Sequence, residues 1–245
     1  MLKINKPVPR DAIRLILFDL DGTLVDSRVD LANSVNGMLR HYGRPELPEQ
    51  VIAGYIGDGA PMLVRRALGD PDDEEFFKQA LEFFILYYRA HKLDTTVVYG
   101  GIVEALRAMR NGNGFERRMA VLSNKPVNPS RGIVEALGLG EFFVQVYGGN
   151  SFPTKKPDPL GALTLARENG VDPGQALIVG DSDIDVLTAR NAGMWSCGVS
   201  YGFAPHSLEQ APPDVLVDAP HELPLVFENP PPESDESADI PGVPV

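Results

Sequence analysis

The sequence is poor in cysteine and in basic residues, and it has no long apolar run. Its single cysteine, Cys197, excludes an internal disulfide and a zinc site built on several cysteines. No apolar stretch approaches the roughly 18 residues of a membrane-spanning helix, so no membrane association is expected. Lys and Arg number 22 against 34 Asp and Glu, a formal net charge of −12. This charge disfavours general binding to nucleic acid, and an anionic substrate would need a local positive site such as a metal ion.

The length and composition suit a folded protein with a sizeable core. The chain has 245 residues, of which 43% are hydrophobic, and this fits one large domain or a core that carries an insertion. The first residues, MLKINKPVPRDA, lack the apolar segment of a signal peptide. A cytoplasmic location is expected, and monomer and homodimer both stay open.

The order of apolar segments indicates an α/β protein with a helical insertion. One apolar strand is followed by three helices with no strand between them, and after Tyr99 strands and helices alternate. The expected strands are Ile13–Phe18, Met119–Leu122, Phe143–Tyr147, Ala176–Val179 and Trp195–Val199. The expected helices are Leu31–Tyr42, Ala60–Leu68, Asp73–Lys92, Ile102–Arg110, Ser130–Leu137, Pro159–Glu168 and Ser182–Asn191. We therefore predict a Rossmann-like, doubly wound parallel sheet with an inserted all-helical cap.

The same pattern sets the expected domain boundaries. The α/β core is assigned to residues 11–27 and 96–227, and the cap to residues 28–95. Residues 228–245 hold five acids and five prolines but no basic residue. Such a composition predicts a disordered tail, because it offers too little apolar surface to bury.

Polar residues follow four of the expected strands. Asp19 and Asp21 come after the first strand, and Ser123, Asn124 and Lys125 follow the second. The loop after the third leads to Lys155 and Lys156, and the fourth is followed by Asp181 and Asp185. Open α/β sheets bind ligands at the carboxyl ends of their strands, so these groups are expected at one edge. Because clustered carboxylates repel one another, a hard divalent cation such as Mg²⁺ is expected among them.

These residues carry a resemblance to a known family. Four segments resemble, in order, the four motifs of haloacid dehalogenase-like hydrolases. They are DLDGTLVDS, LSNK, the Lys156–Pro157 pair and GDSDIDVLTARNAGM. The helical block falls where that family inserts its cap. Within the family, YIGDGAPMLVRRALG is similar to the cap segment of bacterial phosphoglycolate phosphatases, although Asp58 stands where asparagine is expected.

The resemblance implies a role for each matched residue. Asp19 is the expected nucleophile, and Asp21 the acid and base that serves the leaving group and then the water. Asp19, Asp181 and the backbone carbonyl of Asp21 are the expected Mg²⁺ ligands. Ser123, the backbone amide of Asn124 and Lys156 are expected to hold the phosphoryl oxygens, with Asp185 supporting the metal site or pairing with Lys156. The implied substrate is a small anionic phosphoester, 2-phosphoglycolate first among the candidates.

The cap and the reaction class leave alternatives open at this point. Arg65 and Arg66 lie on an expected cap helix, where one could bind a substrate carboxylate or both could face solvent. A dehalogenase has no need of Asp21, which argues against that activity. A mutase or a phosphatase acting on a sugar phosphate or pyrophosphate stays possible, since the core motifs do not separate them. A non-catalytic binding module is a further alternative, although none of the four motifs is lost.

Overall fold

The computed structural model describes residues 2–112 and 115–228. The expected disordered tail, beyond its first residue Glu228, lies outside these residues. The helices are α1 (Arg28–His41), α2 (Glu49–Ala53), α3 (Ala60–Ala67), α4 (Glu74–His91), α5 (Ile102–Arg110), α6 (Val127–Ala136), α7 (Leu160–Glu168) and α8 (Asp183–Ala192). Short 3₁₀ helices are η1 (Gly140–Phe142), η2 (Pro173–Gln175), η3 (Pro205–Glu209) and η4 (Pro220–Phe227). No helix in the described residues is long and apolar enough to cross a membrane.

A seven-stranded sheet forms the centre of the molecule. Its order is β1 (Lys3–Ile4), β11 (Val215–Val217), β10 (Trp195–Val199), β9 (Ala176–Gly180), β2 (Leu15–Phe18), β7 (Arg118–Leu122) and β8 (Gln145–Tyr147). All neighbours pair in parallel except β1 and β11 at one edge. The predicted doubly wound parallel sheet is confirmed, except for this one antiparallel edge pair. The antiparallel edge was not expected, because strands of two and three residues are too short to show a periodicity.

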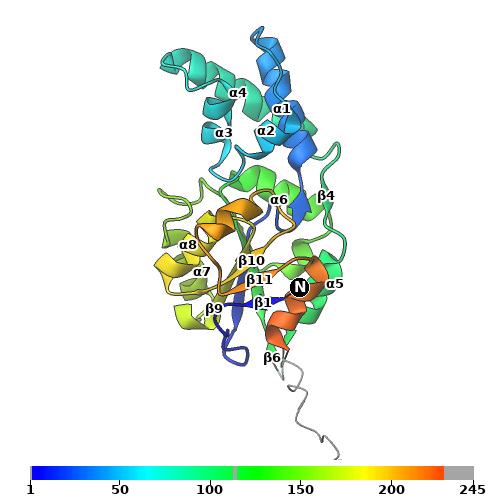
Figure 1. Ribbon diagram of the computed structural model, residues 1–245, viewed down its shortest axis with the longest axis vertical. Coiled ribbons are helices and arrows are strands. Elements are labelled where there is room, and N and C mark those ends of the chain that lie inside the picture. Colours follow the sequence, from blue (N-terminus) through cyan, green and yellow to red (C-terminus); the bar gives the residue numbers. More distant parts are fainter. Residues whose placement is uncertain (1, 113–114, 229–245) are drawn as a thin grey trace, which may run out of the picture.

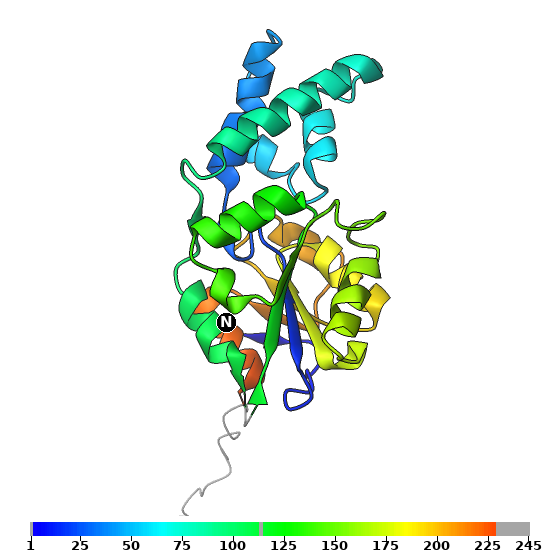
Figure 2. The same cartoon turned by 180° about the vertical axis from the view of Figure 1, so that it is seen from behind.

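Strand β2 lies in the middle of the sheet, and its residues face two apolar layers in alternation. Ile16 and Phe18 pack into a cluster with residues of α5, α6 and η4, whereas Leu15 and Leu17 pack against α7 and α8. Figures 1 and 2 show α7 and α8 on one side of the sheet and α5 on the other. A strand buried on both faces explains why this segment is a continuous apolar run.

The four helices α1–α4 build a separate apolar cluster beyond the carboxyl ends of the strands (Figure 1). Val35, Met38, Val64 and Phe84 are among its buried members. Helix α4 begins after Asp73, whose side chain accepts hydrogen bonds from the amides of Glu75 and Phe76 at 3.0 Å. The helical cap agrees with the sequence prediction. The five-residue helix α2 was not expected, since it is too short to show a helical face.

Two chain crossings connect the cap with the core. Strands β3 (Val25–Asp26) and β4 (Val97–Val98) pair antiparallel there. Asp30, in the first turn of α1, is buried and accepts hydrogen bonds from the amides and hydroxyls of Thr95 and Thr96 at 2.6–3.1 Å. Burial opposes ionisation of Asp30, but these bonds outweigh it and lower its pKa. The ionised Asp30 carboxylate thus links the start of the cap to Thr95 and Thr96, where the chain returns to the core.

Candidate active site

The turn after β2 is shaped by a glycine. Gly22 has a φ of 81°, and a Cβ at this position would lie 2.2 Å from Oδ2 of Asp181. A larger residue is therefore excluded both by its backbone conformation and by this close approach. The glycine lets the chain turn sharply past Asp181, so that Asp19 and Asp21 both line one cavity.

Asp19 belongs to a buried charge network. Its Oδ1 lies 3.0 Å from Nζ of Lys156, which lies 2.6 Å from Oδ1 of Asp185. Asp185 also accepts a hydrogen bond of 2.8 Å from the hydroxyl of Ser182, the residue that caps α8. Burial opposes the charge of Lys156, but Asp185 and Asp19 outweigh it and raise its pKa. The predicted neighbourhood of Asp19, Lys156 and Asp185 is present, and Asp185 forms the expected pair with Lys156.

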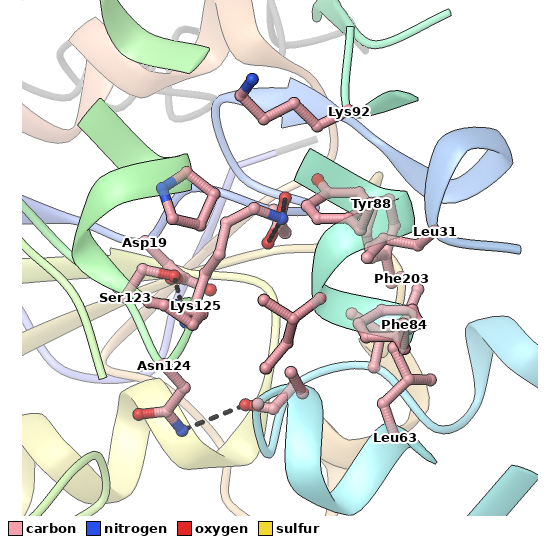
Figure 3. Close-up of a pocket in the computed structure, with 18 of the residues that line it drawn as sticks. Asp19, Leu31, Leu63, Phe84, Tyr88, Lys92, Ser123, Asn124, Lys125 and Phe203 are labelled. Carbon is pink, nitrogen blue, oxygen red and sulfur yellow. Dashed lines mark hydrogen bonds and ion pairs between the residues drawn. The ribbon is translucent and has the colours of Figure 1, made fainter. Parts of the chain in front are cut away.

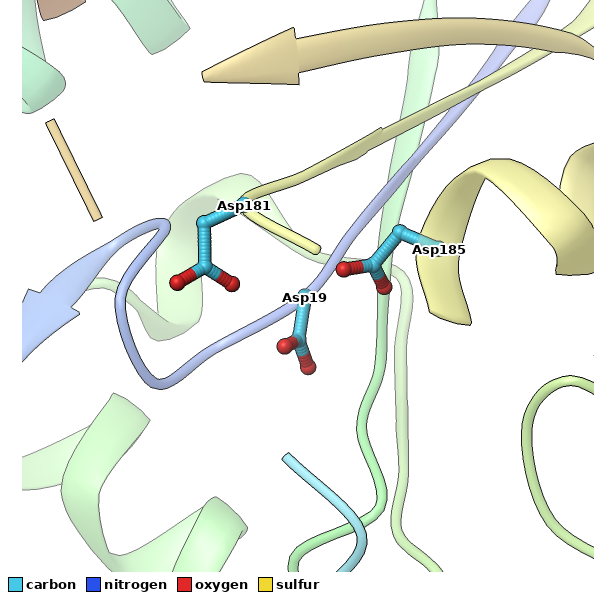
Figure 4. A group of neighbouring side chains, drawn as sticks. All are labelled: Asp19, Asp181 and Asp185. Carbon is cyan, nitrogen blue, oxygen red and sulfur yellow. The ribbon is translucent and has the colours of Figure 1, made fainter. Parts of the chain in front are cut away.

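Three carboxylates converge beside this network. Asp19, Asp181 and Asp185 each offer an oxygen, and these oxygens all lie within 4.8 Å of one another (Figure 4). Burial, followed by the charge of Asp185, raises the pKa of Asp181 to about 8. Burial also raises the pKa of Asp19 to about 6, although Lys156 opposes the shift. Burial and mutual repulsion thus oppose ionisation of these carboxyl groups, and a bound cation would remove this cost. Because the site offers only oxygen ligands, a hard divalent cation fits it.

Asp181 is held from the opposite side by backbone amides. Its Oδ2 accepts a hydrogen bond of 2.6 Å from the amide of Phe203 and one of 3.3 Å from that of Ala204. Its other oxygen is therefore the one available to a metal ion. The contribution of the segment after β10 was not predicted, because a backbone amide can donate whatever the residue type.

The side chain of Asp21 points to different partners. Its two oxygens lie 3.0 and 2.8 Å from Nζ of Lys125, and Oδ1 also accepts a hydrogen bond of 2.6 Å from the hydroxyl of Ser27. This carboxylate is not part of the three-acid cluster, so a metal contact from Asp21 would come from its backbone carbonyl. Lys125 was given no role from the sequence, although its position directly after Ser123 and Asn124 places it at the same strand end.

Ser123 and Asn124 follow β7 on the same edge. Ser123 is buried and lines the cavity, where its hydroxyl accepts a hydrogen bond of 3.3 Å from the amide of Lys125. The Asn124 side chain donates to the carbonyl of Gly57 in the cap at 3.0 Å and to that of Lys156 at 3.1 Å. Lys155 also binds the cap, through the carbonyl of Asp58. The loop at residues 57–59 is thus held against the predicted phosphate-binding residues.

A cavity of about 560 Å³ lies between this edge of the sheet and the cap. Figure 3 shows Asp19, Ser123 and Lys125 on the core side and Leu63, Phe84, Tyr88 and Lys92 on the cap side. Most of the cap wall is apolar, and its cations are Arg89 of α4 and Lys92, the residue directly after this helix. Within residues 2–112 and 115–228, neither cation forms an ion pair.

The structure places Arg65 and Arg66 in ion pairs with other residues of the cap. Arg65 lies 2.9 Å from Glu74 and 3.5 Å from Asp70, and Arg66 lies 2.5 Å from Asp58. Neither arginine lines the cavity. Helix α3 presents Ala60 and Leu63 to the cavity, and Arg65, two positions after Leu63, points to the opposite side of the helix. Arg66 begins on the same face as Leu63, but its side chain binds Asp58 and the carbonyl of Tyr55 instead. The spacing of Phe84, Tyr88 and Lys92, each four residues apart, places them on one helix face, but the spacing alone does not show that this face meets the cavity.

Comparisons with known proteins agree with this geometry. Residues 16–199 match the family model described as haloacid dehalogenase-like hydrolase. A phosphoglycolate phosphatase of Pseudomonas savastanoi pv. phaseolicola is 42% identical over 195 residues, 78% of this chain and 70% of that protein. A phosphoglycolate phosphatase of Chromobacterium violaceum is 37% identical over 215 residues, 86% of this chain and 95% of that protein.

A solved structure supports the same relation. The crystal structure described as a predicted phosphoglycolate phosphatase from Haemophilus somnus 129PT superposes with a TM-score of 0.82 at 32% identity. The match covers 89% of this chain and 99% of that one, so it includes both the sheet and the cap.

Proposed function

This chain belongs to the haloacid dehalogenase-like hydrolase family, and we propose that it is a Mg²⁺-dependent phosphatase that converts 2-phosphoglycolate to glycolate and phosphate. The observation that carries the proposal is the arrangement at the strand ends. A partly buried carboxylate, Asp19, lies beside a buried lysine and two further acids at the base of the cavity. A second carboxylate, Asp21, lines the same cavity with separate partners.

The first half of the proposed reaction uses both carboxylates. An oxygen of Asp19 attacks phosphorus and forms an aspartyl-phosphate. The bond from phosphorus to the glycolate oxygen breaks, and its electron pair stays on that oxygen. Asp21 transfers a proton to it, and glycolate leaves. In the second half Asp21 takes a proton from water, whose oxygen attacks phosphorus and releases phosphate and the Asp19 carboxylate.

The surrounding groups would stabilise the charge of the phosphoryl group. Lys156, the hydroxyl of Ser123 and the backbone amide of Asn124 are the proposed donors to its oxygens. Asp19, Asp181 and the backbone carbonyl of Asp21 are the proposed Mg²⁺ ligands, with Asp185 supporting them. Mg²⁺, when bound, supplies positive charge to the phosphoryl oxygens and screens the acids from one another.

The cap wall supplies the proposed selectivity. Phosphoglycolate carries a carboxylate beside its phosphate. Of the two core lysines, Lys156 is assigned to the phosphoryl group and Lys125 is paired with Asp21. Arg89 and Lys92 line the cavity from the cap and have no acidic partner in the described part of the chain. We assign the substrate carboxylate to these two residues in place of Arg65 and Arg66.

A phosphate-release screen tests the proposal. The purified protein is assayed with Mg²⁺ against a few phosphoesters: phosphoglycolate, glycolaldehyde phosphate, a hexose phosphate, pyrophosphate and para-nitrophenyl phosphate. We expect the highest kcat/KM for phosphoglycolate, and a clear loss for glycolaldehyde phosphate, which lacks only the carboxylate. A preference for a sugar phosphate or pyrophosphate would overturn the substrate assignment, and no release from any ester would overturn the phosphatase assignment.

A further inference from the structure

Each of the two reactive carboxylates has its own buried lysine. Lys156 binds Asp19, and Lys125 binds both oxygens of Asp21 at 2.8 and 3.0 Å. The Lys125 side chain is 5% exposed, and that of Asp21 is 11% exposed. With the hydroxyl of Ser27 as a further donor, the orientation of the Asp21 carboxylate is fixed on both oxygens. Nothing in the proposed chemistry so far uses Lys125.

The burial of Lys125 indicates a role beyond packing. An ammonium group at this depth loses its hydration, and an apolar side chain of the same length would fill the space without that loss. Burial disfavours its charge, but Asp21 outweighs this and holds the pKa of Lys125 above its ordinary value. Lys125 is therefore a permanent cation whose position determines where the Asp21 carboxylate points.

The same ammonium also contacts the cap. Its nitrogen lies 4.5 Å from the centroid of the Tyr88 ring, within the distance of a cation–π contact. Tyr88 is buried on α4, the helix that brings Phe84, Arg89 and Lys92 to the cavity. In Figure 3 the Lys125 side chain extends from the core toward this ring. Tyr88 of the cap and Asp21 of the core thus contact the same ammonium group, that of Lys125.

We propose that Lys125 is a positioning residue that aims Asp21 at the leaving oxygen of the substrate, and that Tyr88 holds Lys125 in place when the cap covers the cavity. This inference rests on the proposed function, because it assigns a role within that reaction. A different role for the same lysine is direct binding of the substrate phosphate. The two roles differ in which step of the reaction fails when the ammonium is removed.

The leaving group separates the two roles. Glycolate departs as an alkoxide that needs a proton, whereas para-nitrophenolate is stable without one. We expect Lys125→Met to slow the first-turnover release of glycolate about 100-fold, as a misplaced catalytic group does, and para-nitrophenol release less than about 3-fold. Asp21→Asn should show the same asymmetry, and Lys125→Arg should recover part of the glycolate rate. Single-turnover mixing measures both rates before hydrolysis of the aspartyl-phosphate contributes.

The contact with the cap has its own variants. Tyr88→Leu should slow glycolate release several-fold and para-nitrophenol release much less, and Tyr88→Phe, which keeps the ring, should recover most of the lost glycolate rate. Tyr87→Leu is the matched control, because Tyr87 is on the same helix but stacks on Phe83 and His91. Its rates should stay at the wild-type level.

Each result decides the inference. Equal losses on both esters, or a raised KM with an unchanged first turnover, would make Lys125 a phosphate ligand and overturn it. If Lys125→Met does not fold, Lys125→Arg carries the same comparison, and a symmetric loss there overturns the inference as well. A wild-type protein that releases phosphate from neither ester removes the proposed function and the inference with it, whereas symmetric losses in an active enzyme leave the function standing.

Discussion

The two walls of the cavity are built in different ways. On the core wall the reactive acids are paired with buried lysines, Asp19 with Lys156 and Asp21 with Lys125. The cap wall is mostly apolar, and its cations Arg89 and Lys92 form no ion pair in the described residues. The core wall thus holds its carboxylates in fixed orientations before a ligand binds. On the cap wall, Arg89 and Lys92 have no acidic partner in the described residues and can bind an anionic ligand.

Removing the proposed nucleophile should have the largest effect and would affect every substrate. Asp19→Asn keeps the shape of the side chain but cannot form the aspartyl-phosphate, so kcat should fall at least about 10⁴-fold for phosphoglycolate and para-nitrophenyl phosphate alike. Asp183→Asn, on the same edge but outside the acid cluster, is the control and should keep its activity. A folded Asp19→Asn protein with a few per cent of activity would contradict the covalent mechanism.

Metal removal comes next and also acts through the core wall. Chelation should stop turnover on both esters, and Mg²⁺ should restore it. Mg²⁺ at about 100 times its Kd should also stabilise the wild-type fold by about 2.7 kcal/mol, which a thermal melt detects without any substrate. Asp181→Asn should lose most of this stabilisation, whereas Asp183→Asn should keep it. Full activity after exhaustive chelation would remove the metal assignment.

Substitutions in the cap wall should affect phosphoglycolate but not para-nitrophenyl phosphate, whereas loss of Asp19 or of the metal ion affects both. If Arg89 binds the substrate carboxylate, Arg89→Ala should lower kcat/KM for phosphoglycolate about 10-fold, the size expected for the loss of one hydrogen bond to a charged group. Activity on para-nitrophenyl phosphate, which has no carboxylate, should stay nearly unchanged. Lys92→Ala is the parallel test.

Arg65→Ala provides the matched control for the cap, because Arg65 is paired with Glu74 outside the cavity. Its kcat/KM for phosphoglycolate should stay within about 3-fold of the wild type, as expected for an exposed ion pair. A loss in Arg65→Ala as large as that in Arg89→Ala would show that both act on the fold of the cap, and the division of labour between the walls would fail.

The smallest effect concerns stability and pH in the absence of metal. Burial, then the charge of Asp185, raises the pKa of Asp181 to about 8. The folded state therefore holds this proton more tightly than the unfolded chain, whose Asp has a pKa of about 3.9. Stability should fall as pH rises between these two values, and level off above the folded pKa.

Thermal melts in chelator at several pH values measure this dependence. From pH 5 to pH 8 the melting temperature of the wild type should decrease by at least about 3 °C more than that of Asp181→Asn, which has no proton to lose. Added Mg²⁺ should reduce the difference, because it stabilises the ionised form. Parallel pH profiles for the two proteins would show that Asp181 is ionised without cost.

Much of the core wall could be predicted from the sequence, because parallel strands bring their carboxyl ends to one edge. Once Leu15–Phe18, Arg118–Leu122 and Ala176–Gly180 are identified as strands, the residues after them must lie close together. The sequence therefore led to Asp19, Ser123 and Asp181 as neighbours, with no knowledge of the strand order. Through the resemblance of its motifs it also indicated the pair of Asp185 with Lys156 as one of two alternatives, the other being support of the metal site.

Only the tertiary structure decided which polar groups of the cap face the cavity. Arg65 and Arg89 are the same residue type on two helices of one apolar cluster, and the rotation of each helix is set by packing around Val64 and Phe84. A rotation of half a turn exchanges the cavity face for the solvent face, so composition and spacing within one helix do not fix the outcome. The contact of Lys125 with Asp21 and Tyr88 depends in the same way on three segments far apart in the sequence. The residues at the strand ends can therefore be predicted from local sequence, whereas contacts across the cavity follow from the packing of the whole chain.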